Sequence, residues 1–105
     1  TEIYTLSLHD ALPISAKDAT DYLRKMKDVS NAEDWEVLHV KGVSSAPLLD
    51  LVTNPGIISE GDVLYCAYGH KSMAAASFMA TKGVNVSDIM GGLSAMLVDA
   101  PDLKI

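Results

Sequence analysis

Hydrophobic positions recur along this chain in two patterns, one with helical spacing and one of short apolar runs. Between residues 16 and 27 the apolar side chains have helical spacing, with charged residues between them: Ala19, Tyr22, Leu23 and Met26. Further helices are predicted at residues 46–52 and 72–82, and a short helical turn is predicted around Trp35. Extended segments are predicted at residues 37–40, 62–66 and 84–89. Helices that alternate with strands predict an α/β fold with a parallel sheet.

Turn-forming residues mark the ends of these elements. Asn31 or Asp34 is expected to cap the short helical turn. Asn54-Pro55-Gly56 is expected to end the second helix, and Gly83 is expected to stop the third. No internal repeat or low-complexity tract occurs, so the pattern predicts one domain.

The single cysteine, Cys66, lies at the turn between an apolar segment and the helix that follows it. A sulfur at such a turn faces backbone N–H groups and the positive end of the helix dipole, with Lys71 and His70 nearby, which favours the thiolate. Gly69 allows the positive φ that lets backbone amides converge on one point. The alternative is that Cys66 is a small buried hydrophobic residue without chemistry, a common role for a lone free cysteine.

Two stretches of the chain together resemble the rhodanese-like domain family. The segment DVLYCAYGHKSMAAASFMATKGVNVSDIMGGLSAM resembles the second half of such a domain. It contains, in the family's order, an apolar strand, a C-x-x-G-x-R-S type of loop, a small-residue helix, a short strand and a Gly-Gly pair. The upstream segment DVSNAEDWEVLHVKGVSSAPLLDL resembles the first-half signature, with these residues in register: Asp28, Glu33, Trp35, His39, Gly42 and Pro47. The resemblance covers most of residues 28 to 98.

This resemblance implies a rhodanese-like parallel sheet flanked by helices, and it implies sulfurtransferase activity. In that chemistry Cys66 takes a sulfane sulfur from a donor such as thiosulfate, holds it as a persulfide, and passes it to a thiol or another nucleophile. The resemblance also implies that the anionic substrate binds to the loop residues Ala67, Tyr68, Gly69, His70, Lys71 and Ser72. No cofactor and no metal ion is expected.

Several positions depart from the family pattern. Lys71 replaces the loop arginine, which keeps the charge but loses the planar guanidinium that binds an oxyanion at two points. Ser30 stands where the pattern has arginine, Leu38 where it has glycine, and Met96 where tryptophan is common. A rhodanese-fold module that binds or regulates without turnover therefore stays open as an alternative. Phosphatase chemistry is disfavoured, because the loop that starts at Cys66 is one residue shorter than that of related phosphatases.

The first residues, TEIYTLSLHDALPI, resemble the translation of a sequencing-library adapter, with Ser15 at or next to the junction. We therefore expect residues 1–15 to be a non-native segment and residues 16–105 to be the rhodanese-like domain. The chain is then a metagenomic fragment whose N-terminal part is truncated and whose fused domains are unknown. No function is assigned to the strand-forming and helix-starting residues of this segment: Ile3, Thr5, Leu6, Leu8, His9 and Asp10.

The family also places an apolar central strand directly before Asp28 and Val29. Here the predicted helix runs through Lys27 into that position, and only Met26 and Val29 suit such a strand. Either several residues are deleted or the helix ends early. A lost central strand would expose sheet edges and leave the fold marginally stable.

Composition limits the function further. At 105 residues, 49% hydrophobic and 21% charged, the chain can bury one modest core. A net charge of -6 without a basic cluster argues against nucleic-acid binding. No apolar run reaches the roughly 20 residues that span a bilayer. A single cysteine fits a reducing, cytoplasmic location. The partners that the resemblance implies are a small-molecule sulfur donor and a thiol acceptor.

Other conspicuous residues are expected to be structural. His39 is expected to form structural hydrogen bonds, and Trp35 to fill the core. His70 either tunes substrate access and pH response or simply faces solvent. Gly91-Gly92 is expected to permit close approach of the backbone near the site. The methionines of apolar segments are expected to pack: Met73, Met79, Met90 and Met96. Three acidic residues are expected to be surface or capping charges: Asp28, Glu33 and Asp34.

Overall fold

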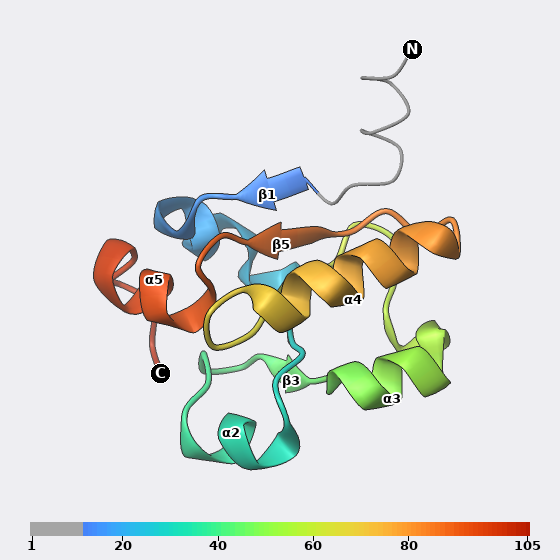
Figure 1. Cartoon of the computed structure of the whole chain (residues 1–105). Helices are drawn as coiled ribbons and strands as arrows, with labels where there is room; N and C mark the ends of the chain where they lie inside the picture. The colour runs from blue at the N-terminus through green and yellow to red at the C-terminus, as the bar shows by residue number, and fades with distance from the viewer. Residues whose placement is uncertain (1–11) are drawn as a thin grey trace.

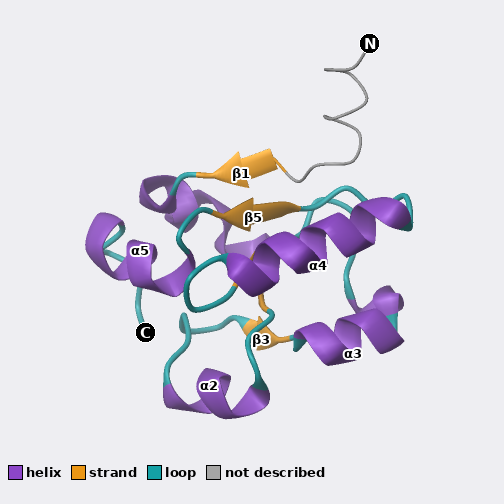
Figure 2. Cartoon of the chain, viewed as in Figure 1, coloured by secondary structure: helices purple, strands orange, loops and turns teal. Residues whose placement is uncertain are grey.

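The computed structural model of the chain describes residues 12–105, and the candidate strand and helix-start residues between Ile3 and Asp10 lie outside that range. Within it, one parallel sheet has the strand order β1-β5-β4-β2-β3. Its strands are β1 (Leu12–Ile14), β2 (Met26–Asp28), β3 (Ser44–Ser45), β4 (Val63–Tyr65) and β5 (Ser87–Ile89). The helices are α2 (Ala32–Val37), α3 (Leu48–Thr53), α4 (His70–Thr81) and α5 (Gly92–Asp99), with 3-10 helices η1 (Ala16–Lys25) and η2 (Pro55–Ile57). The predicted α/β class, a parallel sheet flanked by helices, is confirmed (Figures 1 and 2).

The sheet separates two apolar cores. Successive strand residues point to opposite faces, so Val63 and Tyr65 join one core while Leu64 and Cys66 join the other. The first core includes residues of η1 and α5, and the second includes residues of α3 and α4. Figure 1 shows α4 running alongside β5, with α5 beyond the end of that strand. The side chain of Cys66 therefore lies on the face that α3 and α4 cover.

The segment around the cysteine forms as predicted. All three residues of β4 are buried, as expected for a central parallel strand that is covered on both faces. The helix α4 starts two residues before the expected residue 72 and ends before Gly83, which has a φ of +79°. The predicted strand at 62–66 and the predicted stop at Gly83 are confirmed.

The first predicted helix differs from expectation, because η1 is a 3-10 helix that ends at Lys25. The residues that follow it form the central strand β2, with Met26 opposite Val63 and Asp28 opposite Tyr65. Of the two alternatives for this position, the early end of the helix is therefore the one that occurs.

Three other predicted boundaries were wrong. The extended segment expected at 37–40 starts one residue late, because Val37 still belongs to α2, whereas Leu38 is extended. The N–H of Val40 donates to Tyr65 Oη at 2.9 Å. The second helix begins at Leu48 and not at residue 46, since Pro47 is its N-cap. The last strand begins at Ser87, because the N–H of Val84 bonds back to the carbonyl of Met79.

The edge strand β1 comes from the segment that was predicted to be non-native. Leu12 lies opposite Ser87, and Ile14 lies opposite Ile89. The expected boundary after residue 15 stays a prediction. In the described range, no helix is both long and apolar enough to cross a membrane.

Candidate cysteine site

Cys66 follows the last residue of β4 and lies at the start of α4. Its Sγ accepts hydrogen bonds from the backbone N–H of Gly69 at 3.1 Å and of Ser72 at 3.4 Å. The hydroxyl of Ser72 lies 3.8 Å from the same sulfur. The helix α4 has 12 residues, so its positive dipole end adds to these donors. Sulfur bearing negative charge is stabilised in such a place.

The loop takes this shape because a glycine starts the helix. Gly69 is the N-cap of α4 with a φ of +98°, a conformation that side chains disfavour. The Ser72 hydroxyl donates to the carbonyl of Gly69 at 3.2 Å and closes the turn. These contacts bring the N–H groups of the turn onto one atom, as the sequence predicted.

The Gly91-Gly92 pair supports the loop from behind. A Cβ on Gly92 would overlap the carbonyl oxygen of Cys66 and lie 2.8 Å from the nitrogen of Gly69. Next to this contact, the N–H of Leu93 donates to Cys66 O at 2.7 Å, and the N–H of Ser94 donates to Ala67 O at 3.0 Å. The predicted close approach of backbone at this pair is confirmed.

The thiol itself is buried, with Cys66 only 3% exposed. It packs in the same core as Leu64 and Met79. The residue also lines a pocket of about 220 Å³, whose wall consists of Ser30, Asp34, Cys66, Ala67, Tyr68, His70 and Lys71. Cys66 therefore has both a core contact and an opening toward small molecules.

The structure brings all the predicted loop residues together, in different roles. Gly69 and Ser72 provide the N–H groups, while the remaining members line the pocket: Ala67, Tyr68, His70 and Lys71. His70 is the exposed first residue of α4. Its two interpretations stay open, since it lines the pocket and also faces solvent.

The ammonium of Lys71 contacts a residue outside the loop. Its Nζ donates to Oδ1 of Asn31 at 2.9 Å. Asn31 is the N-cap residue of α2, as predicted, but its side chain makes no capping hydrogen bond. The side chain that could have capped α2 instead holds the cation of the cysteine loop.

Sequence reasoning missed this contribution of the segment after β2. The sequence predicted that Ser30 replaces a family arginine, that Asn31 is a helix cap and that Asp34 is a surface charge. In the structure, Ser30 and Asp34 line the pocket, and Asn31 binds Lys71. The signal that could have found them is strand order. Parallel neighbours such as β2 and β4 bring the loops at their carboxyl ends to the same edge of the sheet.

The prediction of surface charge was wrong for Asp28, which is 1% exposed. Its Oδ1 accepts the N–H of Ser30 at 2.8 Å and so holds the start of the pocket loop. Burial raises the pKa of Tyr65 well above its usual range. The N–H donated by Val40 lowers this pKa, and the Asp28 carboxylate raises it further. The buried hydroxyl of Tyr65 therefore stays protonated beside Asp28.

A second acidic residue, Asp88 of β5, was not singled out by the sequence. Burial raises the pKa of its carboxyl. Asp88 lines a pocket of about 420 Å³ that shares Tyr68 and His70 with the cysteine pocket. The two exposed residues Tyr68 and His70 therefore border both cavities.

Of the residues expected to be structural, His39 behaves as predicted. Its Nδ1 bonds to the carbonyl of Trp35, and the two rings stack with centroids 4.0 Å apart. The expectation that Trp35 fills the core was wrong, because it is only partly buried and belongs to neither core; its Nε1 donates to the carbonyl of Val43 at 3.2 Å. The methionines divide by position. Met79 and Met96 are buried, as expected, whereas the packing prediction was wrong for Met73 and Met90, which are exposed.

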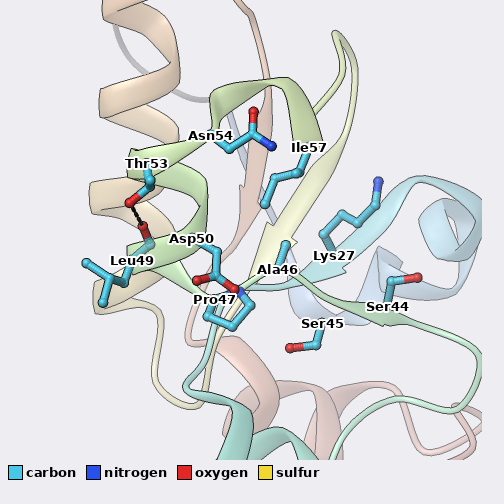
Figure 3. A pocket seen from close by; sticks show the side chains of 10 residues that line it. All are labelled: Lys27, Ser44, Ser45, Ala46, Pro47, Leu49, Asp50, Thr53, Asn54 and Ile57. Atoms are coloured by element: carbon cyan, nitrogen blue, oxygen red, sulfur yellow. Dashed lines mark hydrogen bonds between the residues drawn. The ribbon is translucent and has the colours of Figure 1, made fainter.

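A wider pocket of about 630 Å³ lies over the β3 edge and shares no lining residue with the cysteine pocket (Figure 3). Its side chains come from β2, β3, the link from β3 to α3, α3 itself, and the segment after α3: Lys27, Ser44, Ser45, Ala46, Pro47, Leu49, Asp50, Thr53, Asn54 and Ile57. The Oγ of Ser45 is buried there without a hydrogen-bond partner among the described residues. Across residues 12–105, no three His, Cys, Asp or Glu side chains gather as a metal site.

Comparison with known proteins places the fold. No family model and no curated protein matches the chain. A rhodanese-related protein from Thermoplasma volcanium is 22% identical, with 81% of this chain and 89% of that chain covered and a TM-score of 0.71. A rhodanese-like domain protein from Staphylococcus aureus is 16% identical, with 80% and 89% covered and a TM-score of 0.71. A Rhodopseudomonas palustris protein of unknown function, described as a possible tyrosine phosphatase, is 23% identical, with 94% and 86% covered and a TM-score of 0.72.

These similarities and the strand order define an α/β protein with a cysteine loop between its central strand and the following helix. The fold is that of rhodanese-like domains. The resemblance seen in the sequence is therefore confirmed at the level of fold.

Proposed function

We propose that this chain is a sulfurtransferase in which Cys66 carries a sulfane sulfur as a persulfide and passes it to a thiol. The observation that carries the proposal is the pair of N–H groups, of Gly69 and Ser72, directed at Sγ at 3.1 and 3.4 Å beside an open pocket. The rhodanese-like fold of the matched structures supports it.

In the first step the Cys66 thiolate attacks the outer sulfur of a donor such as thiosulfate. A new S–S bond forms at Cys66, the S–S bond of thiosulfate breaks, and sulfite leaves with the electron pair. The persulfide then carries the negative charge on its terminal sulfur. Before the reaction the N–H groups of Gly69 and Ser72 are oriented toward Sγ, where they stabilise the attacking thiolate.

In the second step an acceptor thiolate attacks the terminal sulfur of the persulfide. The Cys66 thiolate leaves with the electron pair of the broken bond and is ready for another turnover. A reducing compartment such as the cytoplasm would keep Cys66 free for this cycle. A small-molecule donor and a thiol acceptor are the partners of this proposal.

The alternative function is a binding or regulatory module that does not turn over. Two observations favour it: the 3% exposure of Cys66 and the hydrogen bond that engages the Lys71 ammonium with Asn31, a residue outside the loop. Phosphatase chemistry, suggested by the description of the Rhodopseudomonas protein, is opposed by the short loop between Cys66 and Lys71.

Intact-mass spectrometry tests the proposal. The full chain is incubated with excess thiosulfate and, separately, with a low-molecular-weight persulfide, and the mass is measured before and after a thiol is added. The expected result is a gain of one sulfur atom that the thiol removes and that Cys66→Ser lacks. If folded protein gains no sulfur from either donor, the non-catalytic module is the better description. Hydrolysis of an aryl phosphate would instead support the phosphatase.

A further inference from the structure

The cysteine pocket contains both signs of charge. Asp34, in the first turn of α2, and Lys71, in the first turn of α4, both line it. A dianion such as thiosulfate would meet one ammonium and one carboxylate in the same small cavity. The carboxylate repels it, so the side chains of this pocket are poorly matched to a donor that is only negative.

The single ammonium is also limited in what it can bind. Lys71 uses one of its three N–H donors on Asn31, at 2.9 Å. Two donors remain, without the planar fork that would bind two oxygens of one anion in a fixed geometry. Asn31 thus keeps Lys71 beside the pocket as a point charge, which suits one carboxylate better than a sulfonate-like group with three oxygens.

The size of the pocket restricts the donor as well. Its volume is about 220 Å³, below the ~300 Å³ at which sites for drug-sized molecules begin. A compact donor with one positive and one negative group fits both the volume and the charges.

We infer that the sulfur donor is the persulfide of a small α-amino thiol, with its ammonium on Asp34, its carboxylate on Lys71 and its outer sulfur at Cys66. This inference rests on the proposed sulfurtransferase function. Cysteine persulfide is the simplest compound of this class.

The reaction with such a donor needs no oxidant or reductant. The Cys66 thiolate attacks the outer sulfur of R–S–S–H, the S–S bond of the donor breaks, and R–S⁻ leaves with the electron pair. The proton of the outer sulfur passes to R–S⁻, so the products are the Cys66 persulfide anion and the free amino thiol. The outer sulfur keeps its oxidation state throughout.

A comparison of three donors tests the inference on the full chain. Rates of sulfur loading onto Cys66 are measured by intact mass for cysteine persulfide, for 3-mercaptopropionate persulfide, which lacks the amine, and for thiosulfate. We expect cysteine persulfide to load about two- to fivefold faster than either of the others, as an ion pair with the exposed Asp34 carboxylate would give. Equal rates with and without the amine would overturn the inference.

A matched pair of variants assigns the effect to Asp34. Asp34→Asn should abolish the advantage of the amine and speed up loading by thiosulfate. Glu33→Gln removes the same charge from the same turn of α2, at a residue that does not line the pocket, and should change neither rate. Equal effects of the two variants would assign the selectivity to net charge and refute the site.

The two proposals can fail separately. If thiosulfate loads Cys66 as well as cysteine persulfide does, the sulfurtransferase stands and the donor class is wrong. If no donor loads folded protein, as judged by circular dichroism, both proposals fall.

Discussion

Replacing Gly92 by alanine tests whether the backbone behind Cys66 fixes the loop. Gly92 has a φ of +61°, and an added Cβ would overlap Cys66 O and lie 2.9 Å from the carbonyl carbon of Ala67. These neighbours are backbone atoms, so no side chain can rotate away. The chain must separate α5 from the loop or change the turn at Gly92.

The cost has two parts. A side chain in the left-handed region costs about 1–2 kcal/mol. Separation of α5 from the loop would break the bonds from Leu93 N–H to Cys66 O, at 2.7 Å, and from Ser94 N–H to Ala67 O, at 3.0 Å, each worth about 1 kcal/mol. We therefore expect Gly92→Ala to lose about 3–4 kcal/mol of unfolding free energy, a large part of the ~5–15 kcal/mol typical of a domain.

Gly42→Ala is the matched control. Gly42 has a φ of +85°, yet an added Cβ there meets nothing within 4 Å. Gly42→Ala should lose only the unfolding free energy that a side chain in the left-handed region costs, about 1–2 kcal/mol. Urea unfolding of both variants, together with sulfur loading of Cys66, separates backbone strain from the clash. If Gly92→Ala is no less stable than Gly42→Ala and loads sulfur normally, the assignment of Gly92 as the support of the loop is wrong.

Three further outcomes follow from the structure. Lys71→Arg should increase the rate of sulfur loading from thiosulfate, because the guanidinium can bind two oxygens; an unchanged rate would show that this charge does not contact the donor. Tyr65→Phe should lose about 1–3 kcal/mol in urea unfolding, because the buried N–H of Val40 loses its acceptor at 2.9 Å; a neutral change would contradict that bond. Burial raises the pKa of Asp88 above its ordinary 3.8, so the folded chain holds this proton to a higher pH than the unfolded chain. Asp88→Asn should thus be more stable than wild type above the raised pKa and lose this advantage as pH falls toward about 4, measured as the difference between two unfolding curves.

The sequence predicts the parts of the fold that local patterning controls. The run Val63-Leu64-Tyr65 is apolar throughout because the strand is buried on both faces, and a glycine stops the helix after it. The strand β3 has no such signal. It consists of two serines at an edge, and only pairing with Lys27 and Asp28 makes it a strand.

In the site too, local sequence predicts the backbone N–H groups around Cys66, whereas features that depend on strand pairing could not be predicted. The N–H groups around Cys66 belong to one turn, so a glycine three residues after a cysteine was enough to expect them. The end of η1 at Lys25 is set by the residues that follow, which pair as β2 with two neighbouring strands, and no local pattern encodes that pairing.

Strand order also explains why resemblance to the family cannot name the substrate. Because β2 lies next to β4, the segment after β2 supplies Ser30 and Asp34 to a pocket whose cysteine comes from the loop after β4. The N–H groups that favour negative sulfur come from backbone and persist in any sequence that folds this way. The proposed donor-selecting charges are side chains, Asp34 of α2 and Lys71 of α4, and can change without any change of fold. At 16–23% identity, the matched structures show the fold alone, and the proposed choice of donor rests on this chain's own Asp34 and Lys71.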